Sequence, residues 1–266
     1  MRGMIVSILK ATVLLYAGVC ALLYFIQESL IFFPEKLGKN FRFTFDQPFE
    51  EIGVETKDNV LLSAVLFKAA NPKGVVFYLH GNAGSIHSWS DVAPIYTALE
   101  YDVFMLDYRG YGKSEGKIRG EKQFYQDMQA AYDLLKTRYN ENDIVVLGYS
   151  IGSGPAAKIA STNKPRLLIL QAPYYNLKDL MRHYFPVIPT FVLKYPFETN
   201  KFIQQCTMPV VIFHGEEDEI IYYGSSLKLK KLMKPEDTLI TLKGQTHNGM
   251  SSNPAYLTEL KRILQR

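Results

Sequence analysis

The stretch Gly148-Tyr149-Ser150-Ile151-Gly152 decides how this chain of 266 residues is built. It follows an apolar run typical of a buried strand, residues 144–147, and precedes a helix-like segment, residues 153–160. A G-x-S-x-G pattern between a strand and a helix predicts a sharp turn that lifts the serine clear of the sheet. Only glycine is small enough on both sides of such a turn. We therefore expect Ser150 to be a nucleophile at the start of a helix, where free N–H groups stabilise negative charge.

The base that would activate Ser150 is sought among the histidines that follow it. A serine hydroxyl is a poor nucleophile until a neighbouring base, normally histidine, takes its proton. Downstream of the serine, the chain has His183 in an aromatic segment, His214 at the end of an apolar run, and His247 in a loop. We interpret His214 as a strand-end residue that bonds to loop backbone. His247 lies beyond the last expected strand and before a C-terminal helix, so we predict that it is the base.

The acid that would orient His247 should follow the preceding strand, because the expected chain order is serine, acid, histidine. The loop after that strand offers four carboxylates, Glu216, Glu217, Asp218 and Glu219. The acid accepts the histidine N–H, holds the tautomer and stabilises the imidazolium. Composition does not choose among the four.

The loop after a second apolar run, residues 75–79, is the candidate oxyanion hole. A tetrahedral intermediate of acyl transfer carries a negative oxygen and needs two preorganised N–H donors. One donor would be the N–H of Ile151, directly after the nucleophile. The glycine-containing loop 80–85 would present the second, which we assign to Asn82. We expect His80 to brace this loop rather than to take part in chemistry.

Taken in order, these motifs resemble the α/β-hydrolase fold family. The resemblance covers about residues 50–266 and rests on His80-Gly81-Asn82-Ala83-Gly84, the segment 107–116, the G-x-S-x-G stretch, His214-Gly215-Glu216-Glu217-Asp218 and His247-Asn248. It implies a serine hydrolase with a mostly parallel central sheet flanked by helices. The family's H-G-x-x-D pattern implies that Asp218 is the acid.

The N-terminal part narrows the resemblance. The segment 25–34, after a long apolar run, is similar to that of the bud-emergence-type, membrane-anchored α/β-hydrolase-domain serine hydrolases. Two positions depart from the family pattern. Tyr222 stands where members often have proline, and the segment 172–176 lacks the usual serine or threonine residues.

The run from Met4 to Ile26 has Lys10 as its only charge, so it is long and apolar enough to span a bilayer. The rival interpretation is a cleaved signal peptide with Arg2 and Lys10 as its basic region. We favour an uncleaved, single-pass anchor. Positive residues flank both ends of the run, so the side on which the domain lies stays undecided.

Composition and the absence of certain motifs argue against some classes of function. The net charge of +4 is too small for a dedicated nucleic-acid binder, although mild basicity suits an anionic membrane surface. The two cysteines, Cys20 and Cys206, do not report the redox compartment. The sequence has no H-E-x-x-H or C-x-x-C motif, and residue 107 is Asp rather than the glycine of a phosphate loop. We therefore expect no metal and no cofactor.

Strand-like and helix-like segments alternate along the rest of the chain. An antiparallel pair is expected over residues 52–56 and 61–67. Further elements follow in the order strand 75–79, helix 88–99, strand 103–106, helix 121–138, strand 144–147, helix 153–160, strands near 167, 210 and 238, and helix 254–263. Such alternation predicts an α/β fold with a mostly parallel sheet.

We expect three parts: an anchor, residues 1–26; an aromatic linker, residues 27–49, at the membrane interface or packed on the domain; and the α/β-hydrolase domain, residues 50–266. Residues 177–199 interrupt the strand–helix alternation with many aromatic residues. In this fold such an insertion serves as a cap over the nucleophile, with a buried core helix pair as the alternative.

The leading hypothesis is a serine hydrolase that cleaves an ester or thioester of a small-molecule or lipid-like acyl substrate through an acyl-enzyme on Ser150. Amide or peptide cleavage by the same machinery is an alternative, and so is a binding protein that has kept the fold without the activity. The sequence names neither the acyl group nor the leaving group, and it leaves the oligomeric state open.

Overall fold

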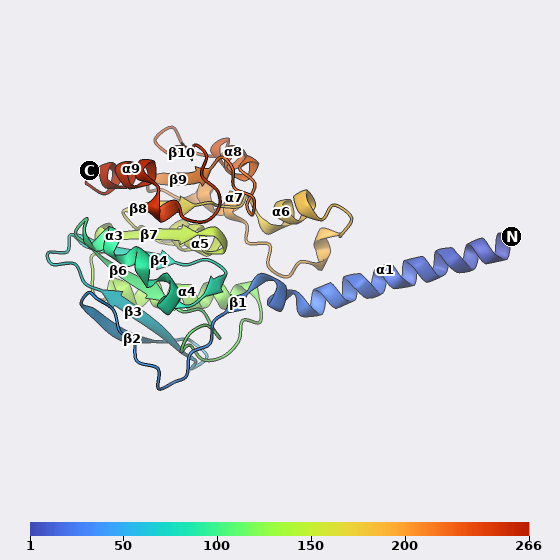
Figure 1. Ribbon diagram of the computed structural model, residues 1–266, viewed down its shortest axis with the longest axis horizontal. Helices are drawn as coiled ribbons and strands as arrows, with labels where there is room; N and C mark the ends of the chain where they lie inside the picture. Colours follow the sequence, from blue (N-terminus) through green and yellow to red (C-terminus); the bar gives the residue numbers. More distant parts are fainter. Residues whose placement is uncertain (266) are drawn as a thin grey trace.

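A sheet of eight strands forms the centre of the protein in the computed structural model, which describes residues 1–265 (Figure 1). The described residues form ten strands in all: β1 (Phe33–Pro34), β2 (Phe49–Glu55), β3 (Leu61–Phe67), β4 (Gly74–Leu79), β5 (Ala83–Gly84), β6 (Tyr101–Leu106), β7 (Ile144–Tyr149), β8 (Leu167–Gln171), β9 (Val210–Gly215) and β10 (Thr238–Leu242). The sheet order is β10-β9-β8-β7-β4-β6-β3-β2, and β1 pairs separately with β5. From β10 to β6 the strands run parallel, whereas β3 pairs antiparallel with β6, and β2 pairs antiparallel with β3.

Helices cover both faces of this sheet. The α-helices of the described residues are α1 (Arg2–Ile31), α2 (Ile86–Trp89), α3 (Ala93–Thr97), α4 (Glu121–Lys136), α5 (Ser153–Thr162), α6 (Leu177–Tyr184), α7 (Thr199–Phe202), α8 (Gly224–Lys230) and α9 (Pro254–Leu264), of which α1 does not cover the sheet. One core packs Phe77 and Val146 against α4 and α5. The other packs Tyr78 and Leu147 against α3 and α9. The predicted α/β architecture is confirmed.

The central strands are buried on both faces, which explains why they read as continuous apolar runs. Every residue of β4, β6 and β7 is buried. The carboxyl ends of parallel strands meet at one edge of a sheet, and loops that bind ligands gather there. The loops after β4, β7, β9 and β10 are those that carry the predicted site residues.

The helix α1 projects from the domain (Figure 1). It is long and apolar enough to cross a membrane, and only Cys20 and Gln27 within it are buried. It ends at Ile31, five residues beyond the predicted Ile26. The next residues join the domain at once, because β1 pairs in parallel with β5 in the loop after β4.

The aromatic linker packs on the domain. Phe32 is buried and meets the ring of Tyr195 edge-on at 5.3 Å. Further along, Phe43 is buried and stacks on Phe45 at 5.3 Å. These two rings of the linker therefore pack on the domain, while a location of the segment at a membrane interface stays a prediction.

The predicted helix over residues 88–99 is broken into pieces. The structure has α2, a 3₁₀ turn (Ser90–Val92) and α3 in its place. Pro94 lies in the first turn of α3. Proline has no N–H to donate into a preceding turn, so it begins a helix and does not continue one. Apart from α1, the other predicted helices, α4, α5 and α9, are found within two residues of their expected ends.

Candidate active site

Ser150 lies on a strained turn between β7 and α5. Its φ angle is +51°, in the left-handed region that residues other than glycine rarely adopt. A Cβ on Gly148 would lie 2.3 Å from the Gly152 carbonyl oxygen, and a Cβ on Gly152 would lie 2.2 Å from the Leu79 carbonyl oxygen. The structure therefore explains both glycines, and the strain holds the Ser150 side chain away from the sheet.

The structure brings Ser150, His247 and Asp218 into one hydrogen-bonded chain. His247 Nε2 lies 3.1 Å from Ser150 Oγ, and His247 Nδ1 lies 2.8 Å from Asp218 Oδ2. Since a carboxylate only accepts, Nδ1 carries the proton and Nε2 is free to accept from the serine hydroxyl. All three side chains are buried. A hydroxyl, an imidazole and a carboxylate in this arrangement can activate an oxygen nucleophile.

Asp218 is held as an anion. Its Oδ1 accepts from the N–H groups of Ile220 and Ile221, at 3.0 and 2.8 Å. Burial alone would raise the pKa of the Asp218 carboxyl, but the histidines and backbone donors around it bring that pKa below its usual range. The anion is the form that orients an imidazole.

A second histidine touches the same carboxylate. His214 Nε2 lies 2.8 Å from the Ile221 carbonyl oxygen and 3.3 Å from Asp218 Oδ2. The carbonyl only accepts, so Nε2 carries a proton. The predicted contact of His214 with loop backbone is confirmed. The contact with Asp218 was missed, because it depends on how the loop folds back.

Two further residues hold the His247 loop in place. The Tyr149 hydroxyl donates to the His247 carbonyl at 2.6 Å, and the His247 N–H donates to Glu219 Oε2 at 3.1 Å. Both stand beside predicted site residues in the sequence. Their partners lie 98 and 28 residues away, so no local pattern reveals the contacts.

The loop that carries Asn82 is fixed by the end of α1. The Asn82 carbonyl accepts from the Phe33 N–H at 2.8 Å and from the Tyr111 hydroxyl at 2.7 Å. Its side-chain amide donates to the Ile31 carbonyl at 3.3 Å. Asn82 and Ile151 both line the cleft beside Ser150. The two residues predicted to donate to an oxyanion are thus near the nucleophile.

His80 supports this loop from within. Its side chain is fully buried and stacks on Tyr108, with ring centroids 4.2 Å apart. Its Nδ1 lies 2.8 Å from the Gly81 carbonyl oxygen, and burial lowers its pKa to about 4. The predicted bracing position of His80 agrees with these contacts.

The candidate site opens into a cleft of about 410 Å³. Its apolar walls come from Ile31, Trp89, Tyr174, Leu177, Leu180, Ile220 and Ile221. Tyr174 also braces the turn, because its hydroxyl accepts from the Gly154 N–H and donates to the Ile151 carbonyl, both at 3.0 Å. Ile31 is the last residue of α1, so the N-terminal helix takes part in the cleft.

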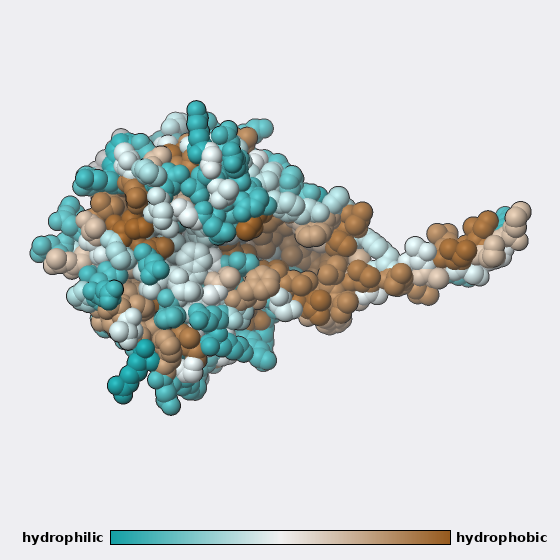
Figure 2. All heavy atoms as spheres, in the orientation of Figure 1, coloured by the Kyte–Doolittle hydropathy of each residue, from teal (hydrophilic) through white to brown (hydrophobic). Residues whose placement is uncertain are grey.

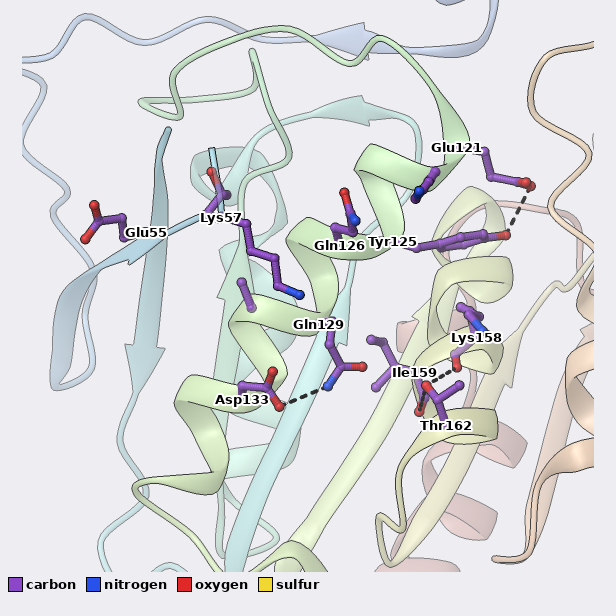
Figure 3. Close-up of a pocket in the computed structure, with 13 residues that line it drawn as sticks. Glu55, Lys57, Glu121, Tyr125, Gln126, Gln129, Asp133, Lys158, Ile159 and Thr162 are labelled. Carbon is purple, nitrogen blue, oxygen red and sulfur yellow. Dashed lines mark hydrogen bonds between the residues drawn. The ribbon is translucent and has the colours of Figure 1, made fainter. Parts of the chain in front are cut away.

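A larger hollow, of about 790 Å³, lies along α4 and α5 (Figure 3). Side chains of mixed charge line it, including Lys57, Glu121 and Lys158. None of the residues predicted for the site is among those lining it. Chemistry, rather than size, identifies the cleft beside Ser150 as the candidate active site.

The cap contributes to the cleft in a different way from the one expected. The lining residues from the insertion 177–199 are Leu177 and Leu180, both in α6. The aromatic stretch that follows α6 does not line the cleft. Phe185 and Phe191 are 62% and 81% exposed, so they are not a buried helix pair either.

Comparisons with known proteins show which proteins the chain resembles. The family model described as serine aminopeptidase, S33, matches residues 70–200. Human alpha/beta hydrolase domain-containing protein 17B is 30% identical over 215 residues, which cover 79% of this chain and 73% of that protein. The Xenopus tropicalis protein of the same name is 32% identical over 198 residues, which cover 73% and 67%.

Solved structures share the fold. An esterase from Pyrococcus furiosus, Pf2001, superposes with a TM-score of 0.70 at 20% identity, over 88% of this chain and 95% of that one. Est1E from Butyrivibrio proteoclasticus, solved with ferulic acid bound, superposes with a TM-score of 0.64 at 21% identity, over 80% and 96%.

Proposed function

The chain belongs to the α/β-hydrolase family, and from that premise we propose that it is a serine hydrolase that cleaves an ester or thioester through an acyl-enzyme on Ser150. The observation that carries the proposal is the hydrogen-bonded chain Ser150–His247–Asp218, at 3.1 and 2.8 Å. A membrane-spanning α1 and an acyl or lipid-like substrate are parts of the same proposal.

In the first half-reaction, Ser150 Oγ bonds to the carbonyl carbon while its proton moves to His247 Nε2. The negative oxygen of the tetrahedral intermediate accepts hydrogen bonds from the N–H groups of Asn82 and Ile151. The intermediate collapses as the bond to the alcohol or thiol breaks, and His247 returns the proton to that leaving group. Asp218 stays ionised throughout.

In the second half-reaction, water takes the place of the leaving group. His247 removes a proton from the water as its oxygen attacks the acyl carbon, and then gives the proton to Ser150 Oγ. The products are a carboxylic acid and the free enzyme. The low pKa of Asp218 supports this cycle, because an anion next to Nδ1 stabilises the imidazolium each time it forms.

The apolar cleft supports an acyl substrate. Each methylene removed from water contributes about 0.8 kcal/mol to binding. Leu177, Leu180 and Ile220 offer apolar surface to such a chain. Amide cleavage would use the same residues with an amine as leaving group. A binding protein without activity would have no need for the strained turn at Ser150.

A fluorophosphonate probe and ester turnover test the proposal on the purified full-length chain. Ser150→Ala should abolish labelling and lower turnover by about a millionfold, while the protein stays folded. Ser153→Ala, three residues further on, is the matched control and should label normally. Labelling of the Ser150→Ala variant would overturn the assignment.

The identity of the acid is tested separately. Asp218→Asn should lower the rate by about four orders of magnitude, because the wrong imidazole tautomer is then favoured. Glu217→Gln should change the rate little, since the Glu217 side chain is exposed. If Glu217→Gln is the crippling change and Asp218→Asn is mild, another carboxylate is the acid.

A further inference from the structure

The loop after α6 has an unusual composition for a surface segment. From Phe185 to Leu193 the sequence FPVIPTFVL contains no charged residue. Three of its side chains point into solvent: Phe185, Val187 and Phe191 are 62%, 74% and 81% exposed. Contiguous apolar groups on a surface mark a contact with a partner or a membrane. The nature of that contact follows from what lies next to the loop.

The neighbour of this loop is α1. The Tyr16 hydroxyl donates to the Val187 carbonyl at 2.7 Å. The buried side chain of Gln27 donates to the Val192 carbonyl at 3.1 Å and accepts from the Lys194 N–H at 2.7 Å. Figure 1 shows the segment after α6 beside α1, and in Figure 2 apolar surface continues from α1 onto the adjoining edge of the domain.

The contacts fix how far along α1 the loop reaches. The polar end is marked by the ion pair between Glu28 and Lys194, at 3.2 Å. From there the loop runs towards the N-terminus as far as Tyr16, which lies ten residues inside the Ile26 end of the predicted span. At 1.5 Å per residue this is about 15 Å, half the thickness of a hydrocarbon core.

Several backbone groups of the loop have partners within the protein, or no N–H to satisfy. In lipid every backbone polar group needs a partner within the protein. Pro186 and Pro189 have no N–H group. The N–H groups of Ile188, Val192 and Leu193 donate to carbonyls within the loop, at 3.0, 3.2 and 3.3 Å. The side chains of α1 satisfy two of its carbonyls.

We propose that residues 185–191 are a second membrane contact, which enters the bilayer beside α1. This contact would seat the domain with the mouth of the cleft at the lipid surface. Ile31 of α1 and Leu180 of α6, the helix that precedes the loop, both line the cleft, together with Ile220. The substrate class is then the acyl ester or thioester of a molecule anchored in the membrane, and this last clause rests on the proposed function.

The test uses the full-length chain in phosphatidylcholine vesicles that carry doxyl groups on their acyl chains. A Val187→Cys variant is labelled with an environment-sensitive fluorophore, and the unsubstituted chain, whose Cys20 and Cys206 are buried, gives the background. Leu257→Cys, on α9 at the far end of the domain from α1, is the matched control. We expect severalfold quenching at 187 and none at 257.

Other outcomes overturn the proposal. If doxyl groups quench the fluorophore at position 187 no more than at position 257, and its emission is not blue-shifted, the loop stays in water. A blue-shifted signal at 187 without doxyl quenching means that protein, such as a second copy of the chain, covers the loop.

A paired functional measurement uses Val187→Glu combined with Phe191→Glu. This variant should hydrolyse a long-chain substrate in vesicles about tenfold more slowly and a soluble acetyl ester at the normal rate. Equal loss on both substrates, or on neither, contradicts the seating of the cleft. Quenching in a protein that hydrolyses nothing would leave the membrane contact standing and reject the proposed hydrolase function.

Discussion

His80 and Asp107 are two ionisable side chains buried beneath the Asn82 loop. His80 Nε2 lies 3.8 Å from Asp107 Oδ1, and among residues 1–265 neither His80 Nε2 nor Asp107 Oδ2 has a hydrogen-bond partner. Burial lowers the pKa of His80 to about 4 and raises that of Asp107 to about 7. Both groups therefore favour their neutral forms, and their effects on stability have opposite signs.

The signs follow from proton counts. Between about pH 4 and 7, folded Asp107 keeps a proton that the unfolded chain releases, so its contribution to stability falls as the pH rises. Between about pH 4 and 6.5, folded His80 lacks a proton that the unfolded chain binds, so its contribution rises. In the wild type the two trends oppose each other.

Single substitutions should separate these trends. Asp107→Asn removes the contribution that falls with pH. Relative to wild type, the free energy of unfolding of this variant should therefore rise by up to about 1.4 kcal/mol per pH unit. His80→Gln should show the opposite slope. Thermal unfolding of the detergent-solubilised protein at about pH 4.5 and 6.5 measures both. Unchanged slopes in both variants would show that the groups titrate normally.

At the scale of elements, the sequence predicts what local pattern controls. The strands of the central sheet are found because each is a short apolar run next to turn residues, as in Val75 to Leu79. The end of α1 was not predicted, because the polar residues Gln27 and Glu28 read as the end of a span. In the structure both side chains lie within the helix and have partners, Val192 and Lys194. Those partners lie about 165 residues away, so no local pattern reveals them.

The two hydrogen bonds between the Gln27 side chain and the loop after α6 give a prediction at the scale of elements. Gln27→Leu leaves the Val192 carbonyl and the Lys194 N–H without partners, which costs about 1–3 kcal/mol. The loop after α6 should open more often, so trypsin should cut after Lys194 severalfold faster. Ser29→Ala is the control, because the Ser29 hydroxyl bonds only within α1. Equal cleavage of the two variants would mean that Gln27 does not hold the loop.

At the scale of the molecule, the sequence predicts the three candidate catalytic residues and their order along the chain. It does not predict which residues line the cleft. The motifs place Ser150, Asp218 and His247 on loops at one sheet edge, and the structure brings them together. The cleft itself draws Ile31 from the N-terminal helix and Leu180 from the cap, and packing between distant segments decides that. The N-terminal helix and the α/β domain therefore both contribute to the cleft.

The cleft walls lead to a prediction on substrate length. For the full-length chain, kcat/KM should rise from acetyl to octanoyl esters by severalfold per pair of carbons, because each buried methylene contributes about 0.8 kcal/mol. Leu180→Ala should flatten the rise while acetyl turnover is kept. Leu257→Ala, on α9 and away from the cleft, should leave the series unchanged.

Kinetics with a series of p-nitrophenyl esters below their micelle-forming concentrations measure this trend. A sharp preference for acetyl esters would show that the apolar walls do not receive the acyl chain. The cleft would then bind an apolar leaving group instead, since Ile31, Leu180 and Ile220 line it together with Ser150.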